Sequence, residues 1–244
     1  MESPPFQPDR VEHRDAPAWS CGVSLLVGGS FDPVHEAHVR LADEARRLAL
    51  GGRGEIVFVP ASRSPHKAQG PSASDEERVE MLGLGALAIE GWSIWRAELD
   101  RAGRGEPSYW IETLRQAREG GAGELWFLIG ADQAAAFHRW REARAILELA
   151  RPLVAPRGEI GDADSLARAL TATGAWSEDE VEAWRGWFVP TPVHDVSATA
   201  IRGALADPAR REKPIAGLDP RVQAYILERG LYQRTGGDGS AGDE

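Results

Sequence analysis

An alternation of short apolar runs with helical patterns constrains the fold of this chain most. The first run, Val23–Val27, ends at Gly28-Gly29 and is followed by apolar residues at helical spacing over Glu36–Leu50. The same succession of strand and helix patterns continues along the chain. Strands that alternate with helices form parallel βαβ units. We therefore predict an α/β fold, with a doubly wound, mostly parallel sheet and helices on both of its faces.

Caps and chain breakers mark the other elements. Ser74, followed three residues later by Glu77, forms a capping box that predicts a helix start. Further strands are expected at 55–59, 92–95, 125–129, 153–155 and 187–189. Further helices are expected at 74–89, 108–118, around 132–138, and at 141–150, 162–183, 197–205 and 220–229, with loops at 61–74 and 100–107.

Composition narrows the class of protein. The 244 residues carry a formal net charge of −10 and one cysteine, Cys21. This charge argues against binding to a nucleic-acid backbone, and a single cysteine provides neither a disulfide framework nor a thiolate metal site. No apolar run is long enough to span a bilayer, and the polar, proline-rich start is not a secretory signal. We expect a cytoplasmic protein that binds neither nucleic acid nor membrane.

The domain organisation is expected to be simple. Residues 1–20 are predicted to be a disordered leader and residues 234–244 a disordered tail. Between them we expect a single domain at 21–233, whose part from about 197 to 233 is helical. The sequence is compatible with a homo-oligomer but contains no identifiable interface patch.

The segment GGSFDPVHEAH, residues 28–38, points to phosphate chemistry. Glycines at a strand end let the backbone approach a phosphate, and a helix N-terminus adds unpaired N–H groups and partial positive charge. His35 and His38 share one face of that helix start. Gly130 ends a second predicted strand, so both glycine turns are expected to line one crevice at the carboxyl edge of the sheet.

The sequence also bears on other roles for the two histidines. Zinc would need further ligands, and no cysteine or HExxH pattern supplies them, so no metal site is predicted. The GxxxxGK[ST] pattern of a Walker A loop is also absent. Spacing alone leaves open that His35 and His38 are only polar residues at a helix start.

Several segments together resemble a known family. GGSFDPVHEAH is similar to the (G)G-x-F-D-P-x-H-x-G-H motif of the nucleotidyltransferase superfamily. Six later segments resemble motifs of bacterial nicotinate-nucleotide adenylyltransferases, in the order of that family. They are SPHK at 64–67, ERVEML at 77–82, SYWIETL at 108–114, IGAD at 129–132 with Trp140, VSATAIR at 196–202, and YI at 225–226 with GLY at 230–232.

The resemblance implies adenylyl transfer from ATP to nicotinate mononucleotide, giving deamido-NAD and pyrophosphate in NAD biosynthesis. His35 and His38 would be catalytic, stabilising charge on the α-phosphoryl group. Mg²⁺ would accompany ATP. The residues implied in ATP binding are Gly28, Gly29, Ser30, Phe31, Gly130, Asp132, Ser197, Thr199, Ile201 and Arg202. Those implied in binding the acceptor are Lys67, Tyr109, Trp110 and Trp140. Asp32, before Pro33, is expected only to shape a turn.

Three positions depart from the family pattern. Ala37 replaces the glycine of H-x-G-H, Ala198 replaces the second serine of I-S-S-T, and Trp110 replaces a threonine that in the family lies near the nicotinate carboxylate. Because Trp110 cannot mimic a small hydroxyl donor in shape, discrimination between acceptors is expected to relax. The alternatives are an adenylyltransferase for nicotinamide mononucleotide or another phosphorylated acceptor, and a nucleotide-binding regulator with weakened catalysis.

Overall fold

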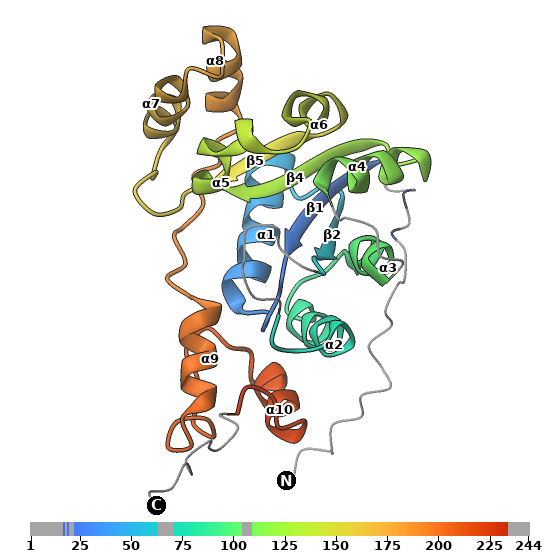
Figure 1. Ribbon diagram of the computed structural model, residues 1–244, viewed down its shortest axis with the longest axis vertical. Coiled ribbons are helices and arrows are strands. Elements are labelled where there is room, and N and C mark those ends of the chain that lie inside the picture. Colours follow the sequence, from blue (N-terminus) through green and yellow to red (C-terminus); the bar gives the residue numbers. More distant parts are fainter. Residues whose placement is uncertain (1–16, 18, 20–21, 63–70, 104–108, 234–244) are drawn as a thin grey trace, which may run out of the picture.

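A five-stranded, wholly parallel sheet forms the centre of the molecule in the computed structural model (Figure 1), which describes residues 17, 19, 22–62, 71–103 and 109–233. The strands are β1 (Val23–Gly29), β2 (Glu55–Pro60), β3 (Trp92–Ile94), β4 (Glu124–Gly130) and β5 (Arg151–Ala155), in the order β3-β2-β1-β4-β5. The order reverses between β1 and β4, which is where ligands bind in open α/β sheets. The predicted doubly wound parallel fold is confirmed.

The central strand is apolar on both sides, as a strand covered by helices on both faces requires. Leu25 and Leu26 are each fully buried. Leu25 lies in a core with residues of α1 (Glu36–Leu50) and α2 (Asp75–Ala86). Leu26 lies in the opposite core, which residues of the helices between β3 and β5 complete.

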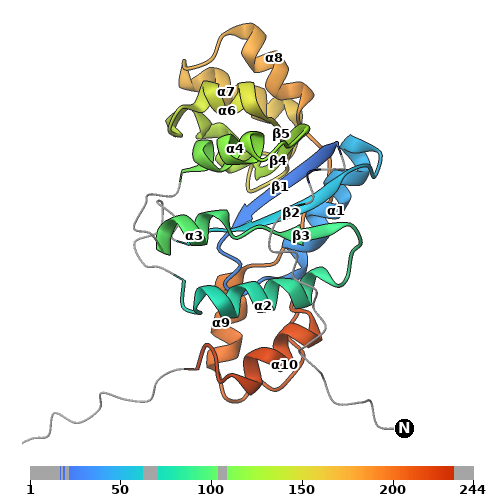
Figure 2. The same cartoon turned by 90° about the vertical axis from the view of Figure 1, so that its right-hand side faces the viewer.

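The helices that cover this second face follow β3, β4 and β5. They are α3 (Ala97–Gly103), α4 (Trp110–Glu119), α5 (Ala131–Ala135), the 3-10 helix η3 (Phe137–Arg139), α6 (Ala143–Leu149), α7 (Ala163–Thr173) and α8 (Glu178–Gly186). In Figure 2, α4, α6, α7 and α8 lie on the side of the sheet away from α2. Among the described residues, no helix is both long enough and apolar enough to cross a membrane.

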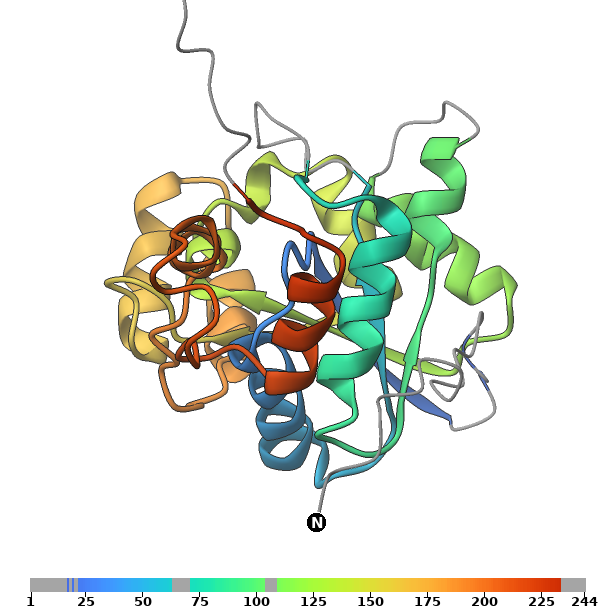
Figure 3. The ribbon, with the colours of Figure 1, turned by 90° about the horizontal axis from the view of Figure 1, so that it is seen from below.

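The last two helices return the chain to the first face. Helix α9 (Ala198–Ala206) and helix α10 (Pro220–Glu228) lie below the sheet in Figure 1. Seen from below, α10 lies beside α2 (Figure 3), and the two helices are in contact. Ile201 of α9 and Ile226 of α10 belong to the same core as α1. This packing brings the C-terminal part of the chain to the carboxyl edge of β1.

Three local predictions need correction. The expected loop at 100–107 begins with the last turn of α3, because Glu98 and Arg101 are buried and both hydrogen-bond Thr113 of α4. The expected helix at 162–183 is two helices, separated where Gly174 adopts a left-handed conformation with φ of 65°. The expected strand at 187–189 is a single parallel bridge from Phe188 to Val154.

The predicted terminal segments lie almost wholly outside the described residues. Pro17 and Trp19, which fall within the expected leader, are described. Trp19 packs edge-on against Trp95, with 5.1 Å between ring centroids. The capping box predicted at Ser74 and Glu77 is confirmed at the start of α2.

Candidate functional site

Strand β1 leads directly into the candidate site. Gly28 and Gly29 end the strand, and a Cβ atom on Gly29 would lie 3.0 Å from the ring of Phe31. Phe31 is fully buried with φ of 46°, and its ring packs edge-on against His38 at 5.1 Å. The close packing of this turn explains why a glycine is needed there. It keeps the Phe31 ring, expected from the resemblance to contact ATP, in the core.

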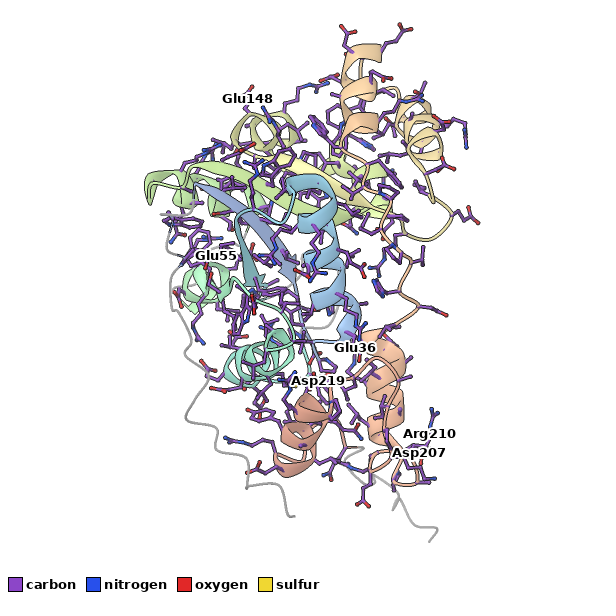
Figure 4. The ribbon with its side chains drawn as sticks, turned by 180° about the vertical axis from the view of Figure 1, so that it is seen from behind. Glu36, Glu55, Glu148, Asp207, Arg210 and Asp219 are labelled. Atoms are coloured by element: carbon purple, nitrogen blue, oxygen red, sulfur yellow. The ribbon has the colours of Figure 1, made fainter. Side chains whose placement is uncertain are left out.

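The two histidines lie together at the start of α1. His35 is the N-cap residue, and its backbone N–H donates to His38 Nδ1 at 3.3 Å. Their rings stack with centroids 3.7 Å apart. The backbone N–H of Glu36 donates to the carbonyl of Gly217 at 2.8 Å, so one N–H group of this helix start is already bonded. In Figure 4, Glu36 lies at the end of α1 that faces α9.

His35 has an environment that favours its neutral form. The residue is 8% exposed, and its buried Nδ1 atom has no hydrogen-bond partner among the residues that the structure describes. Burial, and then the positive charge of Arg157, lower the pKa of His35 to about 4. At neutral pH the ring is therefore uncharged.

Arg157 is a site residue that the sequence reasoning missed. It follows β5 by two residues, and its side chain lies over Gly130, where an added Cβ atom would come within 2.8 Å of Arg157 Cδ. Its Nε atom is 3.8 Å from Oδ2 of Asp132, in the first turn of α5. The available signal was its position just after a strand of the sheet, at the same edge as Gly29 and Gly130.

Helix α9 supplies a second group of polar side chains near the two histidines. Ser197 is its N-cap residue, and Ser197 and Thr199 are exposed. Arg202 donates to the carbonyl of Asp32 at 2.6 Å and is 3.4 Å from the Thr199 hydroxyl. Ile201 points into the core, with 2% exposure, so its side chain anchors the helix. A segment about 160 residues downstream thus lies beside the turn that carries the histidines.

Two further residues stabilise this arrangement and were not singled out from sequence. Arg78 of α2 is fully buried and donates to the carbonyls of Ser30 (2.6 Å) and Ala61 (2.8 Å), just beyond the ends of β1 and β2. Tyr232 donates its hydroxyl to Asp32 Oδ1 at 2.7 Å. The E-R and L-Y motifs contained both residues, but nothing in the sequence indicated their partners.

Aromatic residues link the acceptor candidates on the other side of β1. Trp110 begins α4, and a Cβ atom on Gly28 would lie 3.0 Å from its ring. Phe127 and Phe137 connect Trp110 to Trp140 through successive ring contacts of 6.1, 5.9 and 4.8 Å. The guanidinium of Arg141 lies over Tyr109, 4.5 Å from the ring centroid. Lys67, the fourth acceptor candidate, lies outside the described residues.

The indole N–H of Trp110 is buried, and no described residue accepts a hydrogen bond from it. A buried donor without a partner is costly to a fold, and such groups often serve a ligand. The six-membered part of the ring packs against Gly28 at the end of β1, so the N–H group lies on the side of the indole turned away from that glycine.

The site offers few ligands to a metal ion. No group of three or more His, Cys, Asp or Glu side chains suited to a metal occurs in the described part of the chain. The Asp32 carboxylate accepts hydrogen bonds from the N–H groups of Ser72 and Ala73 and from Tyr232. Asp132, whose side chain is 50% exposed, is the carboxylate still open to solvent. This set suits an ion that keeps its waters and is bound mainly by phosphates, as Mg²⁺ does.

The fold and this edge define a nucleotidyltransferase. The cytidylyltransferase-like family model matches residues 26–204, which include both histidines and Arg202. Curated relatives named "Probable nicotinate-nucleotide adenylyltransferase" include one from Chromobacterium violaceum, 37% identical over 219 residues (85% of this chain and 97% of the relative). Another, from Roseiflexus castenholzii, is 35% identical over 215 residues (87% and 98%). The chain belongs to the nicotinate-nucleotide adenylyltransferase family.

Solved structures support the fold. A Plasmodium falciparum nicotinic acid mononucleotide adenylyltransferase complexed with NaAD superposes with a TM-score of 0.60 at 16% identity, covering 86% of this chain and 97% of that one. The structure described as a complex of the same protein with APC gives a TM-score of 0.59. At this identity, the likeness concerns the fold.

Proposed function

We propose that this enzyme transfers the adenylyl group of ATP to nicotinate mononucleotide. An oxygen of the acceptor's 5′-phosphate attacks the α-phosphorus of ATP, the bond from that phosphorus to the bridging oxygen breaks, and pyrophosphate leaves with deamido-NAD as the other product. Family membership supports the reaction class. The chemistry needs in-line positioning and charge stabilisation more than covalent help from the protein.

The observation that carries the proposal is the convergence of donors at the carboxyl edge of β1 and β4. His35 and His38 come from the start of α1, Arg202 from α9 and Arg157 from the end of β5. An imidazole N–H and two guanidinium groups around one strand edge suit a polyphosphate. A polyphosphate has enough acceptor oxygens to use all of these donors at one glycine turn.

Each donor has a proposed task. The imidazoles of His35 and His38 donate to oxygens of the α-phosphoryl group as charge develops there. Ser197, Thr199 and Arg202 hold the β- and γ-phosphates, and the exposed hydroxyls of Ser197 and Thr199 suit this role. The backbone at 28–31 and 130, with Asp132, lines the nucleoside side. We place Arg157 beside the phosphates, because its side chain lies over Gly130 at the end of β4.

Mg²⁺ is proposed to enter with ATP, because the carboxylates here do not form a preorganised cage. Asp132 is the residue that would contact the ion or its waters. When bound, Mg²⁺ would neutralise charge on the phosphate oxygens.

The acceptor is proposed to bind against the aromatic residues Tyr109, Trp110 and Trp140. Rings suit a pyridine base, and the unpartnered indole N–H of Trp110 is a donor that the nicotinate carboxylate would accept from. Nicotinamide mononucleotide is the second candidate, since Trp110 stands where the family has threonine and an amide carbonyl also accepts. Lys67 stays a proposed contact to the acceptor phosphate.

A pyrophosphate-release assay with ATP, Mg²⁺ and each mononucleotide tests the proposal, with mass-spectrometric identification of the dinucleotide. We expect deamido-NAD and a higher kcat/KM for nicotinate mononucleotide. A clear preference for the amide would replace the acceptor while keeping the reaction. ATP binding without pyrophosphate release from either acceptor would support a regulator instead.

A further inference from the structure

Three separate parts of the chain meet at the carboxylate of Asp32. Its Oδ2 atom accepts from the backbone N–H of Ser72 at 2.8 Å, and its Oδ1 atom accepts from Ala73 N–H at 3.1 Å and from the Tyr232 hydroxyl at 2.7 Å. Arg202 Nη1 is 3.9 Å from Oδ2 and donates to the Asp32 carbonyl. The residue is 5% exposed, so these contacts are shielded from water.

Tyr232 is the most distant of these partners, 200 residues along the chain from Asp32. Its backbone adopts a left-handed conformation with φ of 58°, which is uncommon for a tyrosine. Burial and the bond to Asp32 raise the pKa of the Tyr232 hydroxyl, so the group remains a donor. The uncommon backbone conformation of Tyr232 places its hydroxyl on the Asp32 carboxylate. This indicates a specific role for the hydrogen bond in addition to packing of the ring.

The turn that carries Asp32 also holds Arg202, mainly through a backbone carbonyl. The Arg202 side chain is 31% exposed, and its bond to the Asp32 backbone carbonyl is 2.6 Å long. A shift of the turn around Asp32 would move both the carbonyl and the nearby carboxylate that attract the guanidinium. Asp32 itself has its oxygens engaged by Ser72, Ala73 and Tyr232, which fits a residue that orients others.

We propose that Asp32 and Tyr232 are positioning residues that hold Arg202 in place for the phosphates of ATP. The Tyr232 hydroxyl fixes the Asp32 carboxylate, and the Asp32 turn fixes the guanidinium. This assigns Asp32 more than the turn-forming role expected from sequence, and it gives the C-terminal segment a part in nucleotide binding. The inference rests on the proposed function only in naming ATP as the ligand of Arg202.

Tyr232→Phe removes the hydroxyl and keeps the ring. We expect KM for ATP to rise about three- to tenfold, less than the full loss of a hydrogen bond to a charged group, because the hydroxyl acts on ATP only through Asp32 and Arg202. The value of kcat should change less than about twofold. The affinity for a non-hydrolysable ATP analogue, measured by calorimetry, should fall by the same factor. Tyr225→Phe is the matched control, because Tyr225 lies on α10 in the same core and its hydroxyl has no hydrogen bond among the described residues.

A double-mutant cycle separates positioning from general stability. If Tyr232 acts through Asp32, adding Tyr232→Phe to Asp32→Asn should weaken analogue binding by less than the single substitution does. If Asp32→Asn fails to fold, the binding and kinetic results for Tyr232→Phe alone decide. An unchanged KM and analogue affinity in Tyr232→Phe, with only a lower Tm, would overturn the inference. Analogue binding without turnover in the unmodified enzyme would refute the proposed function and leave this test intact.

Discussion

The two sides of the candidate site are built in different ways. The proposed nucleotide wall, the group His35, His38, Arg157 and Arg202, is fixed by hydrogen bonds from several segments, such as that from Arg202 to the Asp32 carbonyl. The proposed acceptor wall, the group Tyr109, Trp110 and Trp140, consists of ring contacts and one buried N–H without a partner among the described residues. Hydrogen bonds specify particular residues more narrowly than ring packing does. The nucleotide wall should therefore tolerate little change, whereas the acceptor wall can change the acceptor without affecting transfer.

The largest effect is expected on the nucleotide wall. His38→Ala should lower kcat at least about a hundredfold, because it removes a donor proposed to act on charge that develops during transfer. Steady-state pyrophosphate release measures it. His194→Ala is the control, since His194 contacts Glu44 on the side of α1 and has no proposed role. Near-normal turnover in His38→Ala would remove this residue from the mechanism.

The second-largest effect is expected on the binding of ATP. Arg202→Ala should raise KM for ATP about thirtyfold, within the range for charge-assisted bonds to phosphate, and should leave KM for the acceptor nearly unchanged. Initial rates at varied ATP and acceptor concentrations separate the two constants. Arg210→Ala, just beyond the end of α9 (Figure 4), is the matched control. Equal increases in KM for ATP and KM for the acceptor would mean that Arg202 affects the binding of both substrates, which contradicts a separation of the two walls.

A smaller effect concerns the stability of the fold, which we expect to depend on pH through His35. Because the pKa of His35 is lowered from 6.5 to about 4, the unfolded chain binds more protons than the folded one between these values. Stability is then fully present above pH 6.5 and is lost as the pH falls toward 4, by at most about 2 kcal/mol between pH 7 and pH 5. Denaturant unfolding at both pH values should show a smaller loss in His35→Gln. If His35→Gln loses as much stability between pH 7 and pH 5 as the unmodified protein, the pH dependence comes from other groups.

Much of the fold was predictable because it depends on local pattern. Helix α1, the capping box of α2 and the glycine ends of β1 and β4 follow from spacing and short-range chemistry. Local pattern did not predict helix α3, because its last turn depends on buried contacts to Thr113 on another helix.

The site shows the same division. His35, His38 and Arg202 could be proposed because they lie in motifs, and the structure places Arg202 on the turn that leads to the two histidines. Arg157 and Tyr232 were not assigned, because their importance depends on partners far away in sequence, Gly130 and Asp32. Sequence patterns locate a functional group but do not report which distant groups it meets.

The most direct test of the separation between the walls is the ratio of kcat/KM for nicotinate mononucleotide to that for nicotinamide mononucleotide in Trp110→Phe. This variant keeps a ring against Gly28 and removes the indole N–H. Trp126→Phe is the control, because it removes another unpartnered buried indole N–H, from a tryptophan in the opposite core. We predict that the ratio falls about tenfold in Trp110→Phe, because a bond from this N–H to a charged carboxylate is stronger than one to an amide carbonyl, with KM for ATP unchanged. An unchanged ratio, or a shift in KM for ATP of similar size, would contradict the assignment of acceptor choice to Trp110.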